Sequence, residues 1–396
     1  MDRGGATPWD EAATVELAQA LVRIDTTNPP GNEERMAEYL AQQAQGWGLA
    51  ARLLPVAPGR ANLLIRLPGA GQAPTLIYSG HLDTVPVGQQ AWSHDPFAGE
   101  VSQGRLWGRG AADMKGGVAA MLSAMAALRR DQIRLPGDLI FLGTIDEEIG
   151  FLGSHRLLDD GFLDGAGWLV IAEPTNLDLV PAHRGVLWLE IETLGRAAHG
   201  SMPHLGVNAV LHMNALIDRL TRLPLPAPAH RLLPPPTLSV NRVSGGDRIN
   251  VVPDHCLAWV DLRTVPGQDH AALLAELDQV VVSLAASLPE FRCNLRVLAD
   301  RPAVETAADH PLMQSARAVA RGVLGREPAM RGVSYCTDAS VFQPPEKVPT
   351  LIFGPGDDNL AHQRDEHVEI AALVAAGRFF TALPQEIFAR QPVPAQ

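Results

Sequence analysis

The sequence SGHLDTVPVG, residues 79–88, decides how the fold of this chain is interpreted. It overlaps the end of the apolar run from Thr75 to Ser79, which has the length and composition of a strand buried on both faces. Strands of this kind form helix-covered sheets, which present their functional groups beyond the carboxyl ends of the strands. We therefore expect His81 and Asp83 to lie at a sheet edge where a site can form.

Two more apolar runs end in acidic residues. The run from Leu139 to Ile145 leads into Glu147 and Glu148, and the run from Trp168 to Ala172 leads into Glu173. Because the carboxyl ends of parallel strands meet at one edge of a sheet, these clusters are expected beside the first one. Adjacent carboxylates at the end of a buried strand are costly unless cations compensate them. The pattern favours a metal site over a solvated acidic surface.

Asp113 and His362 complete the set. Asp113 lies in GRGAADMKGG, just ahead of an expected helix from Val118 to Leu128, where a carboxylate could bridge two cations. The glycines could instead cradle a phosphate, but the Walker spacing of lysine and serine is absent, and no Rossmann glycine pattern follows a strand. His362 lies in NLAHQRDEHVEI. Imidazoles and carboxylates without a thiolate suit zinc, cobalt or manganese in an open catalytic site.

Length and composition bound the remaining possibilities. The 396 residues and 46% hydrophobic content favour two domains with sizeable cores. A net charge of -12 leaves no basic field for a nucleic acid or an anionic membrane. The chain shows neither an apolar signal core at its start nor an apolar run of about 18 residues, so a cytoplasmic protein is expected. Its 3 cysteines are too few for a disulfide framework.

Alternating segments of helical and strand period indicate an α/β core, and the pattern changes around Arg184. From there the order strand, helix, strand, strand, helix, strand resembles a ferredoxin-like insert. These segments are expected near residues 186–194, 207–220, 237–243, 256–263, 270–286 and 291–298. Because His362 belongs with the earlier ligands, we expect one catalytic domain formed by residues 1–184 and 300–396, interrupted by an insert of residues 185–299.

Together these motifs resemble the metallopeptidase family that includes acetylornithine deacetylase, succinyl-diaminopimelate desuccinylase, aminoacylases and glutamate carboxypeptidases. The resemblance runs from DTTNPPGNE at residues 25–33 to HVEI at residues 367–370. It implies a mixed-sheet α/β metallopeptidase domain, with the insert serving as a lid and dimerisation domain. A homodimer is therefore expected.

The resemblance also implies a ligand set for two divalent metal ions per chain, with zinc the first expectation and cobalt or manganese as alternatives. Asp113 would bridge the two ions. His81 and Glu173 would complete one metal site, and Glu148 and His362 the other.

Glu147 would then be the general base, and Asp83 would stand behind His81. The residues themselves suggest how Asp83 would act. In strand geometry the side chains of His81 and Asp83 share a face, so the Asp83 carboxylate could hydrogen-bond the second imidazole nitrogen and fix its tautomer.

In the insert, the resemblance would place His199 of GRAAHGSMPHLGVNA at the active site of the partner subunit, as an oxyanion stabiliser. Asn250, Arg263 and Thr337 would line the substrate pocket. Arg263 is the natural clamp for a substrate carboxylate, because a planar guanidinium can bind both oxygens at once.

These expectations point to hydrolysis of an N-acyl amino acid by a metal-activated water. A dipeptidase or a glutamate-type carboxypeptidase would use the same metals and base, and stays open as an alternative. A non-catalytic relative that binds metal or peptide is a remote alternative, since such a protein would be expected to have lost a ligand or the base.

Overall fold

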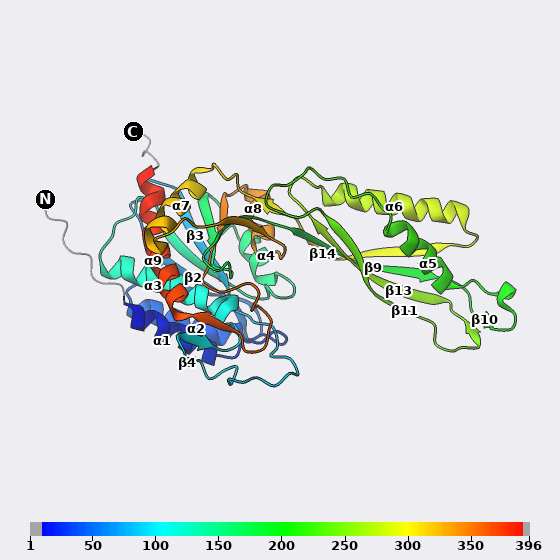
Figure 1. Cartoon of the computed structure of the whole chain (residues 1–396), viewed down its shortest axis with the longest axis horizontal. Coiled ribbons are helices and arrows are strands. Elements are labelled where there is room, and N and C mark those ends of the chain that lie inside the picture. The colour runs from blue at the N-terminus through cyan, green and yellow to red at the C-terminus, as the bar shows by residue number, and fades with distance from the viewer. Residues whose placement is uncertain (1–9, 391–396) are drawn as a thin grey trace. The chain divides into compact units, whose positions relative to one another are not determined.

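The computed structural model describes residues 10–390, which divide into two compact units (Figure 1). Unit 1 contains residues 10–181, 305–331 and 337–390, and unit 2 contains residues 182–304 and 332–336. The segment 332–336, expected in the catalytic domain, belongs to unit 2 because Arg184 N donates to Val333 O at 3.1 Å and Gly332 packs against Leu233. None of the helices between residues 10 and 390 has the length and hydropathy that a membrane span requires.

Among the described residues, nine strands form a large sheet, most of whose residues belong to unit 1, in the order β1-β2-β6-β3-β7-β17-β8-β15, with β16 beside β8. Their bounds are β1 (Ala50–Ala57), β2 (Arg60–Leu67), β3 (Thr75–His81), β6 (Leu139–Thr144), β7 (Ala166–Ile171), β8 (Leu179–His183), β15 (Val304–Glu305), β16 (Met330–Val333) and β17 (Thr350–Ile352). The neighbours β6, β3, β7 and β17 are parallel, whereas β2 and β8 pair antiparallel with this group. The expected mixed sheet is confirmed, and its parallel centre carries the apolar runs.

Helices pack on this sheet and on one another. Their bounds are α1 (Glu11–Arg23), α2 (Glu33–Gly46), α3 (Gly116–Arg130), α4 (Leu152–Asp159), α7 (Pro311–Leu324), α8 (Ala339–Glu346) and α9 (Ile370–Arg390). Helix α3 lies beside α1 and α9, and α2 packs on β1 and β2 (Figure 1). Tyr78 of β3 donates its hydroxyl to Phe380 O of α9 at 2.6 Å, which ties the central strand to the C-terminal helix.

A small three-stranded sheet, β18-β5-β4, was not expected from the sequence. Its strands are β4 (Glu100–Ser102), β5 (Arg105–Trp107) and β18 (His367–Glu369). Each has only three residues, too short for a periodic signal. This sheet joins the chain just before Asp113 to the chain just after His362, and so brings two distant motifs together.

Unit 2 is built on a four-stranded antiparallel sheet in the order β11-β13-β9-β14. The elements are β9 (Gly185–Leu194), α5 (Ala209–Leu220), β11 (Thr237–Gly245), β13 (His255–Thr264), α6 (His270–Ser287) and β14 (Arg292–Arg301). Apolar residues of α5 and α6 bury one face of the sheet (Figure 1). The expected ferredoxin-like order is therefore confirmed. A short ladder of β10 (Ala198–His199) with β12 (Val251–Val252) lies outside this sheet.

Candidate metal centre

The parallel strands bring three of the predicted clusters to one edge of the sheet. His81 is the last residue of β3, Glu147 and Glu148 follow the end of β6, and Glu173 follows the end of β7. Because β6, β3 and β7 are neighbours and run in the same direction, their carboxyl ends meet. The close approach of these clusters, expected from the apolar runs alone, is confirmed.

His81 is buried, and its imidazole has a different partner on each nitrogen. Its Nε2 lies 3.0 Å from Asp113 Oδ1 and 3.9 Å from Glu173 Oε2. Its Nδ1 lies 2.9 Å from the main-chain oxygen of Asp83, whereas the nearer Asp83 carboxylate oxygen is 3.7 Å away. The expected hydrogen bond to the Asp83 side chain is therefore wrong in its acceptor atom. Strand β3 ends at His81, so residues 81 and 83 do not share a strand face.

Asp113 lies between two imidazoles. Its Oδ1 faces His81, and its Oδ2 is 3.4 Å from His362 Nε2. The same Nε2 of His362 is 3.0 Å from Glu148 Oε2. An aspartate that faces one imidazole with each oxygen has the placement that the bridging role requires.

Glu147 is 7% exposed, and one of its oxygens lies within 4.8 Å of ligand atoms of His81 and Glu173. Burial raises the pKa of Glu147 well above the usual value, and the negative charge of Glu173 adds to the effect. A carboxylate with a raised pKa accepts a proton more readily near neutral pH. Its position and proton affinity both suit a base that lies beside the ligands.

The charges of the cluster are unbalanced without cations. Hydrogen bonds to Asp113 and Glu148 raise the pKa of His362 to about 10. Burial raises the pKa of Glu173 well above its usual value. Burial would also raise the pKa of Asp113, but the hydrogen bonds with His362 and His81 outweigh burial and lower this pKa. The carboxylates outnumber the imidazoles here, so the cluster needs positive charge.

The donor set fits divalent metal ions. His81 and Asp113, with Glu148, offer ligand atoms that all lie within 4.8 Å of one another. The second oxygen of Glu148, Oε1, is buried and has no hydrogen-bond partner among the described residues. Buried polar atoms are almost always satisfied, so a carboxylate oxygen left without a donor points to a cation.

A buried glutamate that the sequence analysis did not single out holds the turn that carries Asp113. Glu366 is fully buried, and its Oε1 accepts the N–H groups of Ala112 at 2.9 Å and Asp113 at 3.0 Å. Its Oε2 accepts the N–H of Gly110 at 3.1 Å and the guanidinium of Arg109. Glu366 thus binds the main chain of a proposed ligand. Its only signal in the sequence is its place in the DEHVEI motif.

The carboxylate of Asp83 does the same for the other ligand turn. Its Oδ1 accepts the N–H of Glu147 at 3.1 Å, and its Oδ2 accepts the N–H of Glu148 at 3.3 Å. Burial raises the pKa of Asp83 to about 7. Asp83 therefore acts on the Glu147–Glu148 turn through its side chain and on His81 through its carbonyl oxygen.

The remaining predicted residues are not in this cluster. His199 is an exposed residue of unit 2, and Asn250 adjoins it, because Gly200 N donates to Asn250 O at 2.7 Å. Arg263, also in unit 2, forms a two-point ion pair with Asp261 at 2.9 and 3.1 Å. Thr337 is in unit 1 and fully buried, and its hydroxyl accepts the N–H of Ala339 at 3.1 Å. This contact satisfies the first N–H group of α8, and the contact of Thr337 with substrate stays a prediction.

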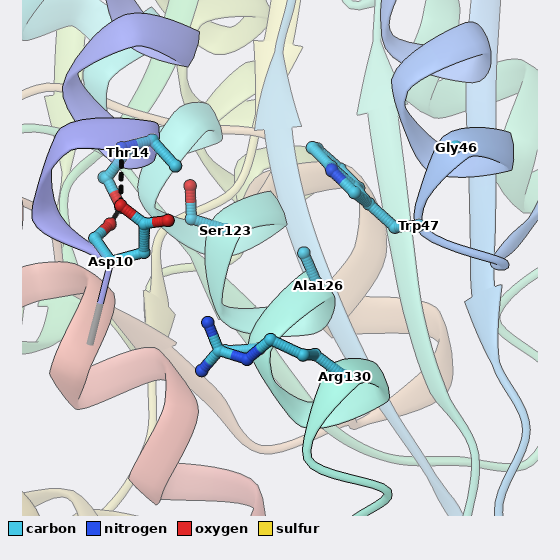
Figure 2. A pocket seen from close by; sticks show the side chains of 9 residues that line it. Asp10, Thr14, Gly46, Trp47, Ser123, Ala126 and Arg130 are labelled. Carbon is cyan, nitrogen blue, oxygen red and sulfur yellow. Dashed lines mark hydrogen bonds between the residues drawn. The ribbon is translucent and has the colours of Figure 1, made fainter. Parts of the chain in front are cut away.

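A hollow of about 410 Å³ in unit 1 lies against the second half of α3, from Ser123 to Arg130 (Figure 2). Trp47 follows α2, Ser123 and Arg130 belong to α3, and Asp10 caps α1 by accepting the N–H of Ala13 at 2.9 Å. None of the predicted ligands or the predicted base is among its lining residues. We therefore place the chemistry at the histidine and carboxylate cluster.

The chain is similar in sequence to known proteins over most of its length. The sequence profile of Peptidase family M20/M25/M40 matches residues 77–386. A probable succinyl-diaminopimelate desuccinylase of Staphylococcus epidermidis is 30% identical over 390 residues, which cover 91% of this chain and 94% of the relative. An acetylornithine deacetylase of Proteus mirabilis is 32% identical over 370 residues, which cover 91% of this chain and 90% of the relative.

The fold is also similar to that of a solved structure. The crystal structure of aminopeptidase PepT from Bacillus cereus superimposes with a TM-score of 0.79 at 20% identity, covering 96% of this chain and 99% of that one. The family resemblance read from the motifs is confirmed, and the chain is a metal-dependent hydrolase. It belongs to Peptidase family M20/M25/M40.

Proposed function

We propose that this protein hydrolyses the amide bond of N-acyl amino acids at a site with two divalent metal ions, zinc being the best fit. The observation that carries the proposal is the position of Asp113 between His81 and His362, with Glu147 beside them. The relatives named as a desuccinylase and a deacetylase support the substrate class. Neutral imidazoles and carboxylates without thiolates support the choice of metal.

The distances support one division of the ligands. Asp113 would bridge, His81 and Glu173 would complete one site, and His362 and Glu148 the other. When bound, such ions would supply Lewis acidity that polarises a carbonyl and lowers the pKa of a water molecule.

In this scheme Glu147 is the group that moves protons. Its buried carboxylate takes a proton from the attacking water and hands it to the leaving amine. The Asp83 carboxylate holds the main-chain N–H of Glu147, which keeps the base at the end of β6 while its proton affinity stays high. The products would be a carboxylate and a free amino acid.

His199 would stabilise the negative charge that develops on the carbonyl oxygen. The N–H of Ser201 donates to His199 Nδ1 at 3.2 Å, and the Ser201 hydroxyl lies 2.7 Å from the same nitrogen. Because Nδ1 accepts, the neutral imidazole carries its proton on Nε2. An Nε2–H donor is the form that an oxyanion needs, and loss of one such donor typically costs about 10² to 10³ in rate.

We propose further that the protein is a homodimer and that each subunit donates His199 to its partner. Mixing inactive His199→Ala chains with inactive Glu147→Gln chains should then restore activity. An equal mixture gives one intact site per heterodimer and about one quarter of wild-type activity after random exchange. Activity is measured after subunit exchange, which mass spectrometry follows separately. Exchange without recovery would show that His199 acts in its own chain or not at all.

Arg263 is proposed to bind the α-carboxylate of the substrate, and Asn250 and Thr337 are proposed as further substrate-binding residues. The ion pair with Asp261 occupies Nε and one terminal nitrogen and orients the guanidinium, while the other terminal nitrogen lies 3.5 Å from Ser334 O. The nitrogen at 3.5 Å makes the weakest contact and is the donor most available to a substrate.

Replacing Arg263 by Lys keeps the charge but loses the planar fork. The preference for a free carboxylate over an amide, measured as the ratio of kcat/KM, should fall by about 1 to 3 kcal/mol. Matched pairs of free and amidated substrates provide the control. Equal losses on both members of each pair would assign Arg263 a structural role.

A substrate panel tests the proposed function itself. The metal-loaded protein is assayed against acetyl, succinyl and formyl amino acids, and against dipeptides and C-terminal glutamate peptides. Highest kcat/KM on an acyl amino acid supports the proposal. Highest kcat/KM on peptides would make the protein a dipeptidase or carboxypeptidase with the same base, and turnover of none would reject both.

A further inference from the structure

The segment NPPGNE, residues 28–33, has no part in the function proposed above. Its first residue, Asn28, is 3% exposed and uses its amide to join two carboxylates. Asn28 Nδ2 donates to Asp83 Oδ2 at 2.9 Å and to Asp146 Oδ1 at 2.9 Å. Two carboxylates that bind the same amide nitrogen lie close enough to repel each other in a buried site. The Asn28 amide is a neutral donor with two hydrogens, so it can bind both of them.

The last residue of the segment acts through Arg60. Glu33 is fully buried, and both of its oxygens bind the Arg60 guanidinium, with the Nε contact at 2.9 Å. The terminal nitrogen Nη2 of Arg60, which binds Glu33 Oε1, also donates to Asp146 Oδ1 at 3.1 Å. Asp146 therefore receives one bond from Asn28 and one from Arg60, and its carboxylate is held from two sides.

Gly31 shows how closely this segment is fitted. Its φ is +96°, and a Cβ at that position would lie 2.4 Å from Arg60 Nε and 2.7 Å from Glu33 Oε2. Only glycine permits that conformation and that approach without strain. The turn is thus built around the Arg60–Glu33 ion pair.

Asp83 and Asp146 fix the turn that carries the proposed base, Glu147, and the proposed ligand, Glu148. Asp83 accepts the N–H groups of Glu147 and Glu148. Asp146 has a left-handed φ of +64°, and its carbonyl accepts the N–H of Gly150 at 3.0 Å and of Phe151 at 2.7 Å. A left-handed conformation at a residue other than glycine persists only where surrounding contacts hold it.

We propose that Asn28, Arg60 and Glu33 are positioning residues of the hydrolytic site. They fix the carboxylates of Asp83 and Asp146, which together set the main chain of the turn. This setting directs Glu147 toward the proton-transfer position and Glu148 toward His362. The proposal rests on the proposed function for its kinetic consequence, but its structural consequence can be measured without any substrate.

The first test replaces Asn28 by Ala in the metal-loaded, full-length protein. Outer residues that orient a metal site typically change activity or metal affinity by about 10- to 100-fold, so kcat should fall in that range. KM should change by less than about threefold, because the substrate contacts are elsewhere. Residue-resolved hydrogen exchange should show the Glu147 and Glu148 amides opening at least about tenfold faster.

Asn62→Ala is the matched control. Asn62 is a fully buried asparagine that also makes two side-chain hydrogen bonds near this turn, to Gly153 O at 2.8 Å and from Ile145 N at 3.0 Å. It contacts neither Asp83 nor Asp146 in these bonds. Its replacement should lower the melting temperature about as much as Asn28→Ala, while kcat stays within about twofold and the Glu147 amide keeps its protection.

A second variant separates positioning from loss of stability. Arg60→Met alone would strand the buried Glu33, so Arg60→Met is combined with Glu33→Leu. Replacing a buried ion pair by apolar residues is often neutral for stability, so the melting temperature should change little. Asp146 still loses its cationic partner, and kcat should fall by about tenfold.

The outcomes decide between the two levels of the proposal. Equal kcat losses in Asn28→Ala and Asn62→Ala at equal folded fraction, or a double variant with wild-type kcat, would overturn the positioning role. If the wild-type protein hydrolyses nothing in the panel, the proposed function fails. The exchange rates of the Glu147 and Glu148 amides would then still decide whether Asn28 and Arg60 hold the turn.

Discussion

Exhaustive removal of divalent cations is expected to abolish hydrolysis by this protein, and zinc, cobalt or manganese should restore it at about two ions per chain. The physical reason is the clustering of four carboxylates, Asp113, Glu147, Glu148 and Glu173, around only two imidazoles, so the groups that can carry negative charge outnumber those that can carry positive charge. Activity is measured after dialysis against a chelator and after stepwise readdition, with metal content determined in parallel. Full activity in the demetallated protein would refute the mechanism.

The demetallated protein should also show a characteristic pH dependence of stability. Glu147 and Glu173 have pKa values raised above 4.5, and His362 has a pKa raised from 6.5 to about 10. Each group therefore binds a proton in the folded state at pH values where the unfolded chain has released it. The free energy of unfolding should fall as pH rises above 4.5, and fall further between 6.5 and about 10. Asp113, with its lowered pKa, acts in the opposite sense below 3.8.

Bound cations should remove most of this dependence, since they bind the deprotonated ligands. Melting curves of the metal-loaded and demetallated forms across this pH range test the point. A demetallated form that gains stability as pH rises would contradict the charge distribution described for the cluster.

Replacing Glu147 by Gln should reduce kcat by about 10² or more while leaving nearly two metal ions per chain. Glutamine keeps the shape of the side chain but cannot accept the proton, and the ligand distances around Asp113 and His362 do not involve Glu147. Kinetics and metal analysis of the same preparations give the answer.

Glu148→Gln is the matched variant from the adjacent position. Glu148 lies 3.0 Å from His362, and one of its buried oxygens has no hydrogen-bond partner among residues 10–390, so its replacement should cost a metal ion first and activity as a consequence. If Glu147→Gln loses a metal and Glu148→Gln keeps both, the two roles must be exchanged.

Most of the fold could be predicted because buried strands consist of runs of apolar residues that are visible in the sequence. The runs ending near Ser79, Ile145 and Ala172 became β3, β6 and β7, with ends within about two residues of those expected. Parallel pairing then followed from their burial on both faces, and this pairing assembled the candidate ligands. The order of helices and strands along unit 2 was predictable from their helical and strand periods.

The residues that hold the ligand turns could not be predicted in this way. Glu366 and Asp83 bind main-chain N–H groups. Almost every residue type has such a group, and the donor and acceptor have no fixed separation in the sequence. Asn28 acts through the carboxylates of Asp83 and Asp146, and Arg60 acts through that of Asp146, over sequence separations that no local pattern reports. Segment 332–336 joins unit 2 through contacts with Arg184, Leu233 and Arg263, which lie 70 or more residues away in the sequence and likewise have no local signature.

The place of β17 in the sheet has a consequence for synthesis of the chain. It lies between β7 and β8, yet it is made about 180 residues later. Until then β7 presents an open apolar edge, a template for pairing with other chains. At about 5–20 residues per second, roughly 10–40 s separate the emergence of Glu173 from that of His362. All of unit 2 is therefore synthesised while the edge of β7 is still unpaired. Chaperone protection of the growing chain would matter most during this interval.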